Sequence, residues 1–327
     1  MSDVIKRNSR IYVAGHTGLV GSALMREISR NGFTSVITIT HNELDLANQM
    51  EVQSFFKKEK PEFVFLAAAK VGGILANNSY PAEFIHENLA IQTNVIHEAW
   101  KNSVKRLLFL GSSCIYPKDS PQPIKEEYLL TGPLESTNRP YAIAKIAGIE
   151  MCWAYNRQYG TQFLGVMPTN LYGPEDNFDL ETSHVVPALM RKMHEAKVNG
   201  ESKVTVWGTG QPRREFLYSD DMARACLYLM NLSDTEFKKF FEEFHPPLIN
   251  IGYGQDLSIA ELATMIAEVV GFKGEIQFDK TKPDGVWRKL LDSSLLRSMD
   301  WHPKTDLREG LMMTYSTFSK SSRRILS

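Results

Sequence analysis

Two short runs between residues 110 and 148 contain side chains that can move protons. Tyr141 and Lys145 lie four residues apart in PYAIAKIAG, so on a helix the phenol and the ammonium share one face. A nearby ammonium lowers the pKa of a phenol, which makes tyrosine a usable proton donor and acceptor near neutral pH. Ser112, in LGSSCIYP, follows an apolar run, and its hydroxyl can polarise a ketone. These residue types predict reduction of a carbonyl group, although the four-residue spacing alone also arises by chance.

A glycine-rich run near the N-terminus predicts a dinucleotide site. It follows the apolar run RIYVAG, precedes a helical pattern, and consists of Gly15, His16, Thr17, Gly18, Leu19, Val20 and Gly21. Gly15 permits a tight turn, Gly18 lets backbone amides approach a pyrophosphate, and Gly21 allows close packing. The helix N-terminus adds positive potential. A plain glycine-rich turn is the alternative, but the order strand, loop, helix favours dinucleotide binding.

The choice between NAD and NADP depends on the end of the second expected strand, residues 35–39. An acid there would bind the ribose 2′-hydroxyl of NAD. The first acids come later, at Glu43 and Asp45, so NADP is favoured by elimination. Arg10 and His41 could face a 2′-phosphate, although a surface position is equally open for each. Asp45 could contact the adenine edge.

Alternating apolar strands and amphipathic helices must position these side chains. Strands are expected at 10–15, 35–39, 63–68, 106–111 and 163–167, and helices at 19–31, 48–58, 82–101 and 139–159. Continuous apolar strands between helices indicate a parallel sheet covered on both faces. With right-handed crossovers this predicts an α/β fold with a doubly wound, Rossmann-like sheet.

The pattern changes after about residue 173, where glycine and proline become frequent. Short strands at 204–207, 248–251 and 275–278 are expected with helices at 185–197, 219–231, 258–270 and 307–320. We therefore expect a dinucleotide-binding domain over 1–173 and a smaller mixed α/β substrate lobe over 174–327, with one segment returning to the main sheet. Ligands on such folds bind at the carboxyl ends of the strands.

Composition excludes several other classes of protein. The 327 residues have 37 Lys and Arg against 38 Asp and Glu, a formal net charge of −1, which argues against nucleic-acid or membrane binding. A hydrophobic fraction of 43% excludes intrinsic disorder. Three scattered cysteines predict neither disulfides nor a metal site. The polar start MSDVIKRNSR does not resemble a signal peptide, and no apolar run reaches the roughly 18 residues of a membrane span, so a cytoplasmic location is expected.

The ordered combination of glycine loop, serine and Tyr–Lys pair is more specific than any one part. The spacing GxxGxxG resembles the extended branch of the short-chain dehydrogenase/reductase superfamily. Nearly the whole chain, from about residue 10 to past 310, is similar to the GDP-L-fucose synthase family. The segments that resemble it are AGHTGLVGSA, LAAAKVGGI, LGSSCIYP, PYAIAKIAG, MPTNLYGPEDNF, SHVVPALMRK, WGTGQPRREFLYSDDMA and KPDGVWRKLLD.

This resemblance implies two reactions at one site. A GDP-linked 4-keto-6-deoxy hexose is inverted at C3 and C5, and NADPH then reduces its C4 ketone. By position, Ser112 binds the C4 oxygen, Tyr141 protonates it, and Lys145 lowers the pKa of Tyr141 and binds the nicotinamide ribose. Cys114 matches the epimerisation base and His184 the acid. From the residues alone, Cys114 would be a packed thiol and His184 a helix cap.

The resemblance also implies further contacts with both ligands. Besides the glycine loop, His41, Asp45, Ser112, Tyr141, Lys145 and His184, it assigns cofactor binding to Leu110, Gly111, Ser113, Pro168, Thr169, Asn170 and Leu171. Substrate binding is assigned to Lys192, Trp207, Arg214, Asp284 and Lys289. Surface positions, or a core position for Trp207, are the alternatives.

Four positions depart from the pattern of the family. Lys192 stands where arginine is common, which replaces a bidentate fork with a point charge. Thr17 and His41 stand where some members have arginine near the adenosine phosphate. Glu175 replaces a common histidine, with no consequence that we can derive.

Other functions and the assembly stay open at this stage. A related enzyme could act on another GDP-4-keto sugar, such as a heptose, and a non-catalytic dinucleotide sensor could share the fold. The superfamily resemblance implies a homodimer through a four-helix bundle formed by helices 82–101 and 139–159. Their apolar residues could equally form intramolecular core; they are Leu89, Ile91, Val95, Ile96, Ile146, Ile149, Met151 and Trp153.

Overall fold

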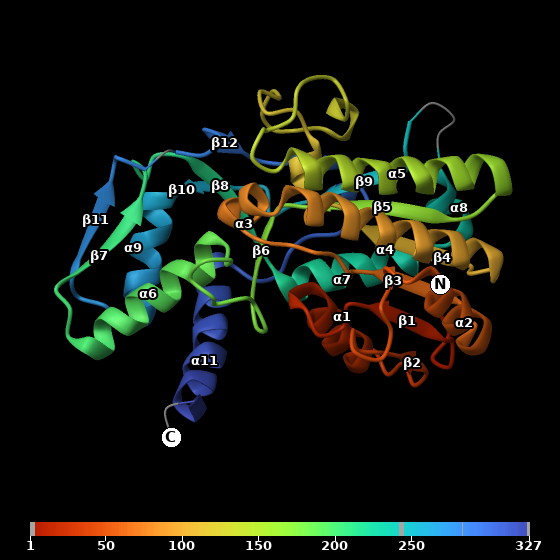
Figure 1. Cartoon of the computed structure of the whole chain (residues 1–327), viewed down its shortest axis with the longest axis horizontal. Coiled ribbons are helices and arrows are strands. Elements are labelled where there is room, and N and C mark those ends of the chain that lie inside the picture. The colour runs from red at the N-terminus through yellow and green to blue at the C-terminus, as the bar shows by residue number, and fades with distance from the viewer. Residues whose placement is uncertain (1–3, 242–244, 283, 326–327) are drawn as a thin grey trace.

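A six-stranded parallel sheet forms the centre of the molecule (Figure 1). The computed structural model describes residues 4–241, 245–282 and 284–325. The strand order is β2 (Val36–Ile37), β1 (Ile11–Ala14), β3 (Phe63–Leu66), β4 (Arg106–Leu110), β5 (Phe163–Pro168) and β9 (Leu248–Ile251). Every neighbouring pair is parallel, which confirms the predicted doubly wound α/β fold.

Alternating side chains of the sheet enter two separate cores. Ile11 and Val13 pack with α1 (Leu19–Arg30) and α7 (Ser219–Met230), whereas Tyr12 packs on the other face. That other face is covered by α2 (Gln49–Glu59), α4 (Pro81–Lys101) and α5 (Arg139–Tyr159) (Figure 1). Because both faces are covered, the strands are mainly apolar, as the sequence predicts.

The edge strand β2 is shorter than the five residues predicted for it. Only Val36 and Ile37 pair with β1, and both are half-buried. An edge strand can form hydrogen bonds with a neighbouring strand on one side only. Fewer of its residues are therefore held in the sheet. The apolar pattern therefore continues beyond the paired residues, to Ile39, which packs on the core without joining the sheet.

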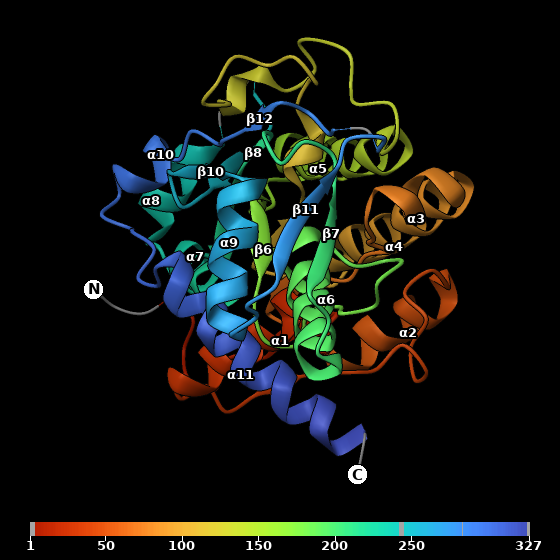
Figure 2. The same ribbon diagram turned by 90° about the vertical axis from the view of Figure 1, so that its left-hand side faces the viewer.

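A smaller lobe lies beside the carboxyl ends of the main strands (Figure 2). In it β7 (Lys203–Trp207) pairs in parallel with β11 (Glu275–Asp279). Its helices are α6 (Val185–Asn199), α9 (Ile259–Val270) and α11 (Leu307–Ile325). Buried residues of α6 and α9, together with Val204 and Val206 of β7, form a third core.

A small mixed sheet, which the sequence analysis did not predict, joins the two lobes. Its central strand is β8 (Arg213–Tyr218), which pairs with β6 (Asn170–Tyr172), β10 (Asp256–Ser258) and β12 (Arg288–Lys289). These strands have six residues or fewer and mix polar with apolar side chains, so they lack the periodicity that predicts a strand. The remaining short elements are α3 (Ile74–Ser79), α8 (Asp234–Phe237), α10 (Ser294–Arg297), η1 (Ser113–Ile115), η2 (Glu126–Tyr128) and η3 (Lys238–Phe240).

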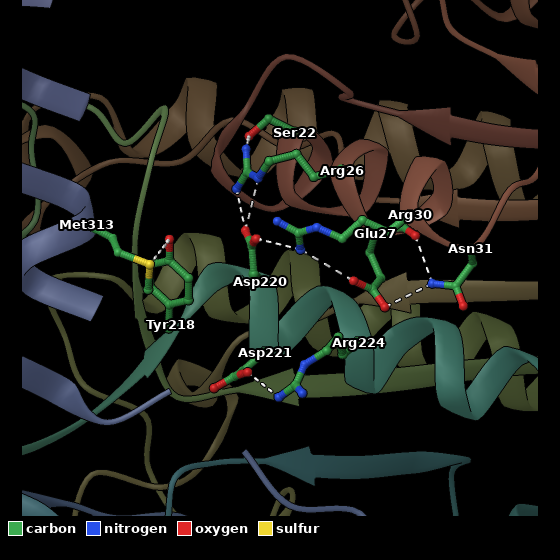
Figure 3. Close-up of polar contacts among 10 residues, drawn as sticks. All are labelled: Ser22, Arg26, Glu27, Arg30, Asn31, Tyr218, Asp220, Asp221, Arg224 and Met313. Carbon is green, nitrogen blue, oxygen red and sulfur yellow. Dashed lines mark hydrogen bonds and ion pairs between the residues drawn. The ribbon is translucent and has the colours of Figure 1, made fainter. Parts of the chain in front are cut away.

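Two neighbouring aspartates at the start of α7 fix that helix (Figure 3). Asp220 binds Arg26 of α1 at 2.5 Å and Arg30 at 2.9 Å. Asp221 is buried, binds Arg224, and accepts the backbone N–H groups of two later residues, at 3.1 and 2.9 Å. These residues are Lys304 and Thr305. The first aspartate therefore joins α7 to α1, and the second joins it to the segment before α11.

A buried asparagine joins the main sheet to the loop after β4. Asn250, in β9, is fully buried. Its Oδ1 accepts the hydroxyl of Tyr116 at 2.6 Å, and its Nδ2 donates to the carbonyls of Ile124 at 3.0 Å and Asp292 at 3.1 Å. Since buried polar groups need partners, three distant segments depend on this one side chain.

Substitution of Asn250 should destabilise the protein more than removal of any single bond. In Asn250→Ala the Tyr116 hydroxyl and the carbonyls of Ile124 and Asp292 each lose one hydrogen bond, and we expect the free energy of unfolding to fall by about 2–4 kcal/mol. Tyr116→Phe removes one bond and should cost about 1 kcal/mol. Urea unfolding of both variants measures this; equal losses would show that the two carbonyl bonds contribute nothing.

Candidate active site

The glycine loop lies between β1 and α1 and permits two very close backbone contacts. Gly15 has a φ of +81°, and a Cβ placed there would lie 2.7 Å from the backbone nitrogen of Ala68. A Cβ at Gly21 would lie 1.9 Å from the carbonyl oxygen of Gly15. Gly18, at the N-cap of α1, has no side chain to compete for the first helix amides. The loop thus presents free N–H groups where a pyrophosphate can bind.

The acids near the end of β2 already have partners. Glu43 accepts the backbone N–H of Thr40 at 3.0 Å and its hydroxyl at 2.6 Å, and these bonds lower the pKa of Glu43. Asp45 accepts the N–H of Ala47 at 2.9 Å. His41 is exposed. Both carboxylates therefore stabilise local turns, which agrees with the elimination of an NAD-type acid.

The serine, tyrosine and lysine meet at the carboxyl end of β4. Ser112 is the N-cap of η1, and its hydroxyl accepts the backbone N–H of Cys114 at 3.4 Å and lies close enough to the Tyr141 hydroxyl to affect its pKa. Lys145 donates from Nζ to the carbonyl of Leu110 at 2.8 Å and lies 5.8 Å from the centroid of the Tyr141 ring. All three side chains come from the ends of β4 and α5, as their positions in the sequence predict.

Burial controls the protonation of this group. It lowers the pKa of Lys145 to about 8, because the charged ammonium is removed from water. It raises the pKa of Tyr141 above the ordinary value, and the Ser112 hydrogen bond opposes that rise. Burial rather than Lys145 therefore dominates the pKa of Tyr141 in the protein, which differs from the lowering expected from the sequence.

Cys114 lies in the same group of side chains and is only 7% exposed. Burial raises the pKa of its thiol. Three neighbours oppose this rise, in decreasing order Lys289, the Ser112 hydroxyl and Lys145. The thiol thus has a lysine close enough to favour the thiolate, and that lysine is one that the resemblance assigns to the substrate.

His184 comes from a different element, as the N-cap of α6. The residue is exposed, while the surrounding protein lowers the pKa of its imidazole. The preceding residue lies against the loop after β3, where a Cβ at Gly73 would be 2.9 Å from the carbonyl oxygen of Ser183. Within the described residues, no hydrogen bond joins His184 to Ser112 or Cys114.

The other residues expected to bind the cofactor line the ends of β4 and β5. Leu110 and Ser113 are buried, and a Cβ at Gly111 would lie 2.2 Å from Cε of Met167. Pro168 ends β5. This edge is therefore packed so tightly that backbone groups, not long side chains, form its surface.

The run after β5 binds to β8 through its side chains. Thr169 donates its hydroxyl to the carbonyl of Glu215 at 3.1 Å, and Asn170 donates its amide to the same carbonyl at 2.8 Å. Leu171 packs against the core beside α1. These contacts place the expected cofactor run directly against the strand that contains Arg214.

Trp207 and two lysines form a cationic aromatic group on the small lobe. The Trp207 side chain is 60% exposed, so the alternative of a core aromatic is wrong. The ammonium of Lys192 lies 5.7 Å from the centroid of the Trp207 ring, and that of Lys282 lies 5.4 Å from it. Lys282 was missed by the sequence analysis, although it lies two residues before Asp284.

Arg214 and Lys289 are neighbours in the register of β8 and β12. Burial lowers the pKa of both, and the charge of Asp284 opposes this for Arg214. Asp284 itself accepts the N–H and the hydroxyl of Thr209, at 2.9 and 2.7 Å. Two partly desolvated cations side by side suit a diphosphate.

The described part of the chain offers neither a metal cluster nor a membrane-spanning helix. Within residues 4–241, 245–282 and 284–325, no three His, Cys, Asp or Glu side chains come together as a metal site would need. No helix in these ranges combines the length and apolar character needed to cross a bilayer.

A parallel sheet with a glycine loop after its first strand, and with serine, tyrosine and lysine at the end of its fourth, defines an enzyme of the extended short-chain dehydrogenase/reductase class. Residues 11–252 match the model of the NAD dependent epimerase/dehydratase family, and the chain belongs to that family.

Curated relatives confirm the resemblance to GDP-L-fucose synthases. The chain is 57% identical over 321 residues to GDP-L-fucose synthase 1 of Arabidopsis thaliana, covering 98% of this chain and 96% of that protein. It is 51% identical over 317 residues to GDP-L-fucose synthase of Escherichia coli (strain K12), covering 96% of this chain and 98% of that protein.

Solved structures include both fucose synthases and heptose reductases. A GDP-L-fucose synthetase from Naegleria fowleri bound to NADP has a TM-score of 0.87 and 28% identity, covering 99% of this chain and 98% of that one. A GDP-mannoheptose C4 reductase from Campylobacter jejuni with NADP bound has a TM-score of 0.88 and 43% identity, covering 96% and 99%.

The contact between Gly21 and Gly15 gives a test of the dinucleotide site. In Gly21→Ala the new Cβ must displace the loop, and overpacking by about 1–3 kcal/mol should weaken binding of a nicotinamide dinucleotide by about 10- to 100-fold. Ser22→Ala, the next position on α1, is the control and should bind within about twofold of wild type. Calorimetry measures both, and equal affinities would contradict the site.

Proposed function

We propose that the protein epimerises GDP-4-keto-6-deoxy-D-mannose at C3 and C5 and then reduces the C4 ketone with NADPH to give GDP-L-fucose. One observation supports both reactions at a single site: the Ser112 hydroxyl accepts the N–H of Cys114 at 3.4 Å and lies close enough to the Tyr141 phenol and the Cys114 thiol to lower the pKa of both groups. A carbon base next to the group that binds a ketone suits epimerisation, which a plain reductase does not need. The names of the curated relatives agree with this reading.

The residues present fit NADPH. The loop from Gly15 to Gly21, which no Cβ could enter at its two ends, would bind the pyrophosphate at the N-terminus of α1. His41, exposed beside a loop whose acids are already bonded, would face the 2′-phosphate. Lys145 and Thr169 to Leu171 would contact the nicotinamide half. NADPH, when bound, supplies the hydride that C4 receives.

In the reduction, the protein's task is to bind and protonate the C4 oxygen. Ser112 donates a hydrogen bond to that oxygen, which polarises the ketone. Tyr141, close to Ser112, then donates the proton as charge develops on the oxygen. Lys145, charged below its pKa of about 8, stabilises the phenolate that remains.

In the epimerisation, the C4 ketone acidifies the protons on C3 and C5. The Cys114 thiolate takes the proton, and the electron pair of the broken C–H bond passes into an enolate that Ser112 stabilises at oxygen. His184 returns a proton to the opposite face of the same carbon. The raised pKa of Cys114 makes its thiolate a stronger base. The lowered pKa of His184 makes its imidazolium a stronger acid.

The nucleotide would bind across the small lobe. Arg214 and Lys289 face the diphosphate, Trp207 offers an aromatic face to the base, and Lys192 and Asp284 contact the remaining polar groups. The exposure of Trp207 and the pairing of Arg214 with Lys289 support this assignment.

A second candidate is reduction of another GDP-4-keto sugar, such as a GDP-heptose. The observation that favours it is the likeness to two heptose reductases, at 40% and 43% identity, above the 28% of the solved fucose synthetase. The site residues fix a GDP group and a 4-ketone better than the substituent at C6. Product analysis by NMR with both substrates distinguishes the two candidates.

We also propose a homodimer through α4 and α5, a cytoplasmic location and a division of the chain after residue 173. Val95, Ile96, Ile146 and Ile149 are buried within one chain, so they belong to its own core. A shallow hollow on the same two helices, lined by Pro81, Ala82, Ile85, Arg139, Pro140 and Ile143, leaves apolar surface for a partner. The cytoplasmic location is supported by three unpaired cysteines, all buried.

Variants of Cys114 and Tyr141 should separate the two reactions. In deuterated water, Cys114→Ser should not incorporate deuterium at C3 and C5, because a serine hydroxyl is far too weak an acid to act as the thiolate does. Its ketone would still be reduced, slowly, to an uninverted sugar. Tyr141→Phe should show the reverse, with deuterium incorporated but reduction about 100-fold slower. NMR of the recovered sugars measures both.

His184→Asn completes this test. We expect one of the two inversions to survive, since water can partly replace a lost acid. Wild-type incorporation at both carbons in Cys114→Ser would contradict the assignment of the base, and rapid reduction by Tyr141→Phe would contradict that of the proton donor.

The pKa of Lys145 predicts the alkaline limit of the reduction. Since burial lowers this pKa to about 8, the ammonium loses its charge as the pH rises through that value, and kcat/KM should fall there. Lys145→Arg keeps a charge whose pKa is above about 12 and should show no such fall up to pH ~10, even if it is slower overall. A wild-type rate that stays constant to pH ~10 would show that Lys145 remains charged.

A further inference from the structure

Glu215 is a fully buried carboxylate at the meeting point of three segments of the site. Its Oε1 accepts the N–H of Gly254 at 2.6 Å, and its Oε2 accepts the N–H of Leu291 at 3.1 Å. Its backbone carbonyl accepts Thr169 and Asn170. The mechanism above does not use this residue.

The surroundings of Glu215 leave it no freedom to move. A Cβ at Gly252 would lie 2.4 Å from its Oε1. Among the described residues no cation lies within ion-pair distance of it, and burial raises its pKa. Two backbone amides are therefore the main compensation for burying the carboxyl group, and each of its oxygens is committed to one of them.

One of these two bonds controls the segment that contains Lys289. β12 is only two residues long, Arg288 and Lys289, with Lys289 opposite Arg214. Arg288 binds Asp256. Beyond the strand, Leu290 donates its N–H to Oε1 of Gln122 at 2.8 Å, and Leu291 donates to Glu215. So short a strand cannot position a side chain by its ladder alone. These two bonds hold its carboxyl end together with the backbone bonds between Ile124 and residues 290 and 292.

The charge of Lys289 interacts with the Cys114 thiol and with the charged groups of Arg214 and Glu135. Lys289 is the cation with the greatest effect on the Cys114 thiol, ahead of Lys145 on α5. Arg214 on β8 and Glu135, before α5, also act on Lys289, and Ser112 and Tyr141 are the remaining polar groups around the thiol. A small displacement of β12 therefore changes both the charge beside Cys114 and the pair of cations formed with Arg214.

We propose that Glu215 is a positioning residue, which holds Lys289 through Leu291 so that one ammonium serves both the Cys114 thiol and the GDP diphosphate. The role of Lys289 toward the diphosphate rests on the proposed function, whereas its role toward the Cys114 thiol does not. Glu215 touches neither ligand in this scheme and acts only through β12.

Glu215→Gln tests this with little change of shape. Two backbone N–H groups need two acceptors, and glutamine offers one oxygen and one amino group, so one N–H loses its partner. We expect GDP to bind about 5- to 20-fold more weakly, as loss of a buried bond to a charged group implies. We also expect the pH of half-maximal reaction of Cys114 with iodoacetamide to rise by about half a unit or more. Cys152 and Cys226 are fully buried, and peptide mass spectrometry confirms which thiol has reacted.

Asp221→Asn is the matched control. Asp221 is also a buried carboxylate that accepts two backbone N–H groups, but it lies at the start of α7 (Figure 3). The Asp221→Asn variant should have a lower melting temperature, as Glu215→Gln should, but an unchanged GDP affinity and an unchanged reaction of Cys114 with iodoacetamide. A purely structural role for Glu215 would make the two variants alike.

Gln122→Ala supplies a second route if Glu215→Gln does not fold. It removes the acceptor of Leu290 from the half-buried loop on the other side of β12, and it should shift both readouts in the same direction. Unchanged GDP affinity and an unchanged Cys114 profile in the variants that fold would overturn the proposal, as would equal shifts in Asp221→Asn. If wild type itself does not bind GDP, the proposed function is wrong, and the Cys114 profile alone decides whether Glu215 positions Lys289.

Discussion

The close backbone contact between Gly21 and Gly15 is the constraint on which the rest of the structure depends. No side chain fits between them, so α1 begins directly at the edge of the sheet, with its first amides free. Arg26 and Arg30 of α1 then bind Asp220 and place α7 beside it. Because α7 follows β8 immediately, the position of the glycine loop is transmitted to the strand that contains Arg214 and Glu215.

Local patterns predicted the main sheet and the side chains at its edge. The strands buried on both faces are continuous apolar runs, and the glycine loop and the Tyr141–Lys145 pair need only neighbours in sequence to be recognised. The small joining sheet was not predicted, because its pairings are long-range and its strands too short for a period to show. The same holds for β2, where the apolar pattern extends beyond the residues that find a partner.

The electrostatic effects of the site residues on one another were harder to predict than which residues belong to the site. Sequence placed Lys289 with the substrate, but its effect on Cys114 depends on β12 lying next to β8, which no local pattern reveals. Burial likewise outweighs the pairing of Tyr141 with Lys145, and burial is a property of the whole fold. Lys282 was missed because a lysine in a polar loop looks like any solvated residue until Trp207 is found beneath it.

The contact between Gly252 and Glu215 has a consequence for how the chain can vary. Any β-carbon at 252 would collide with the carboxylate, and any shorter acid at 215 would leave a void beside Gly254 and Leu291. The two positions are therefore epistatic: a substitution that changes the size of either residue needs a compensating change at the other. Single substitutions that change size are disfavoured at this point, so sequences that descend from this one should keep such a pair or exchange it together.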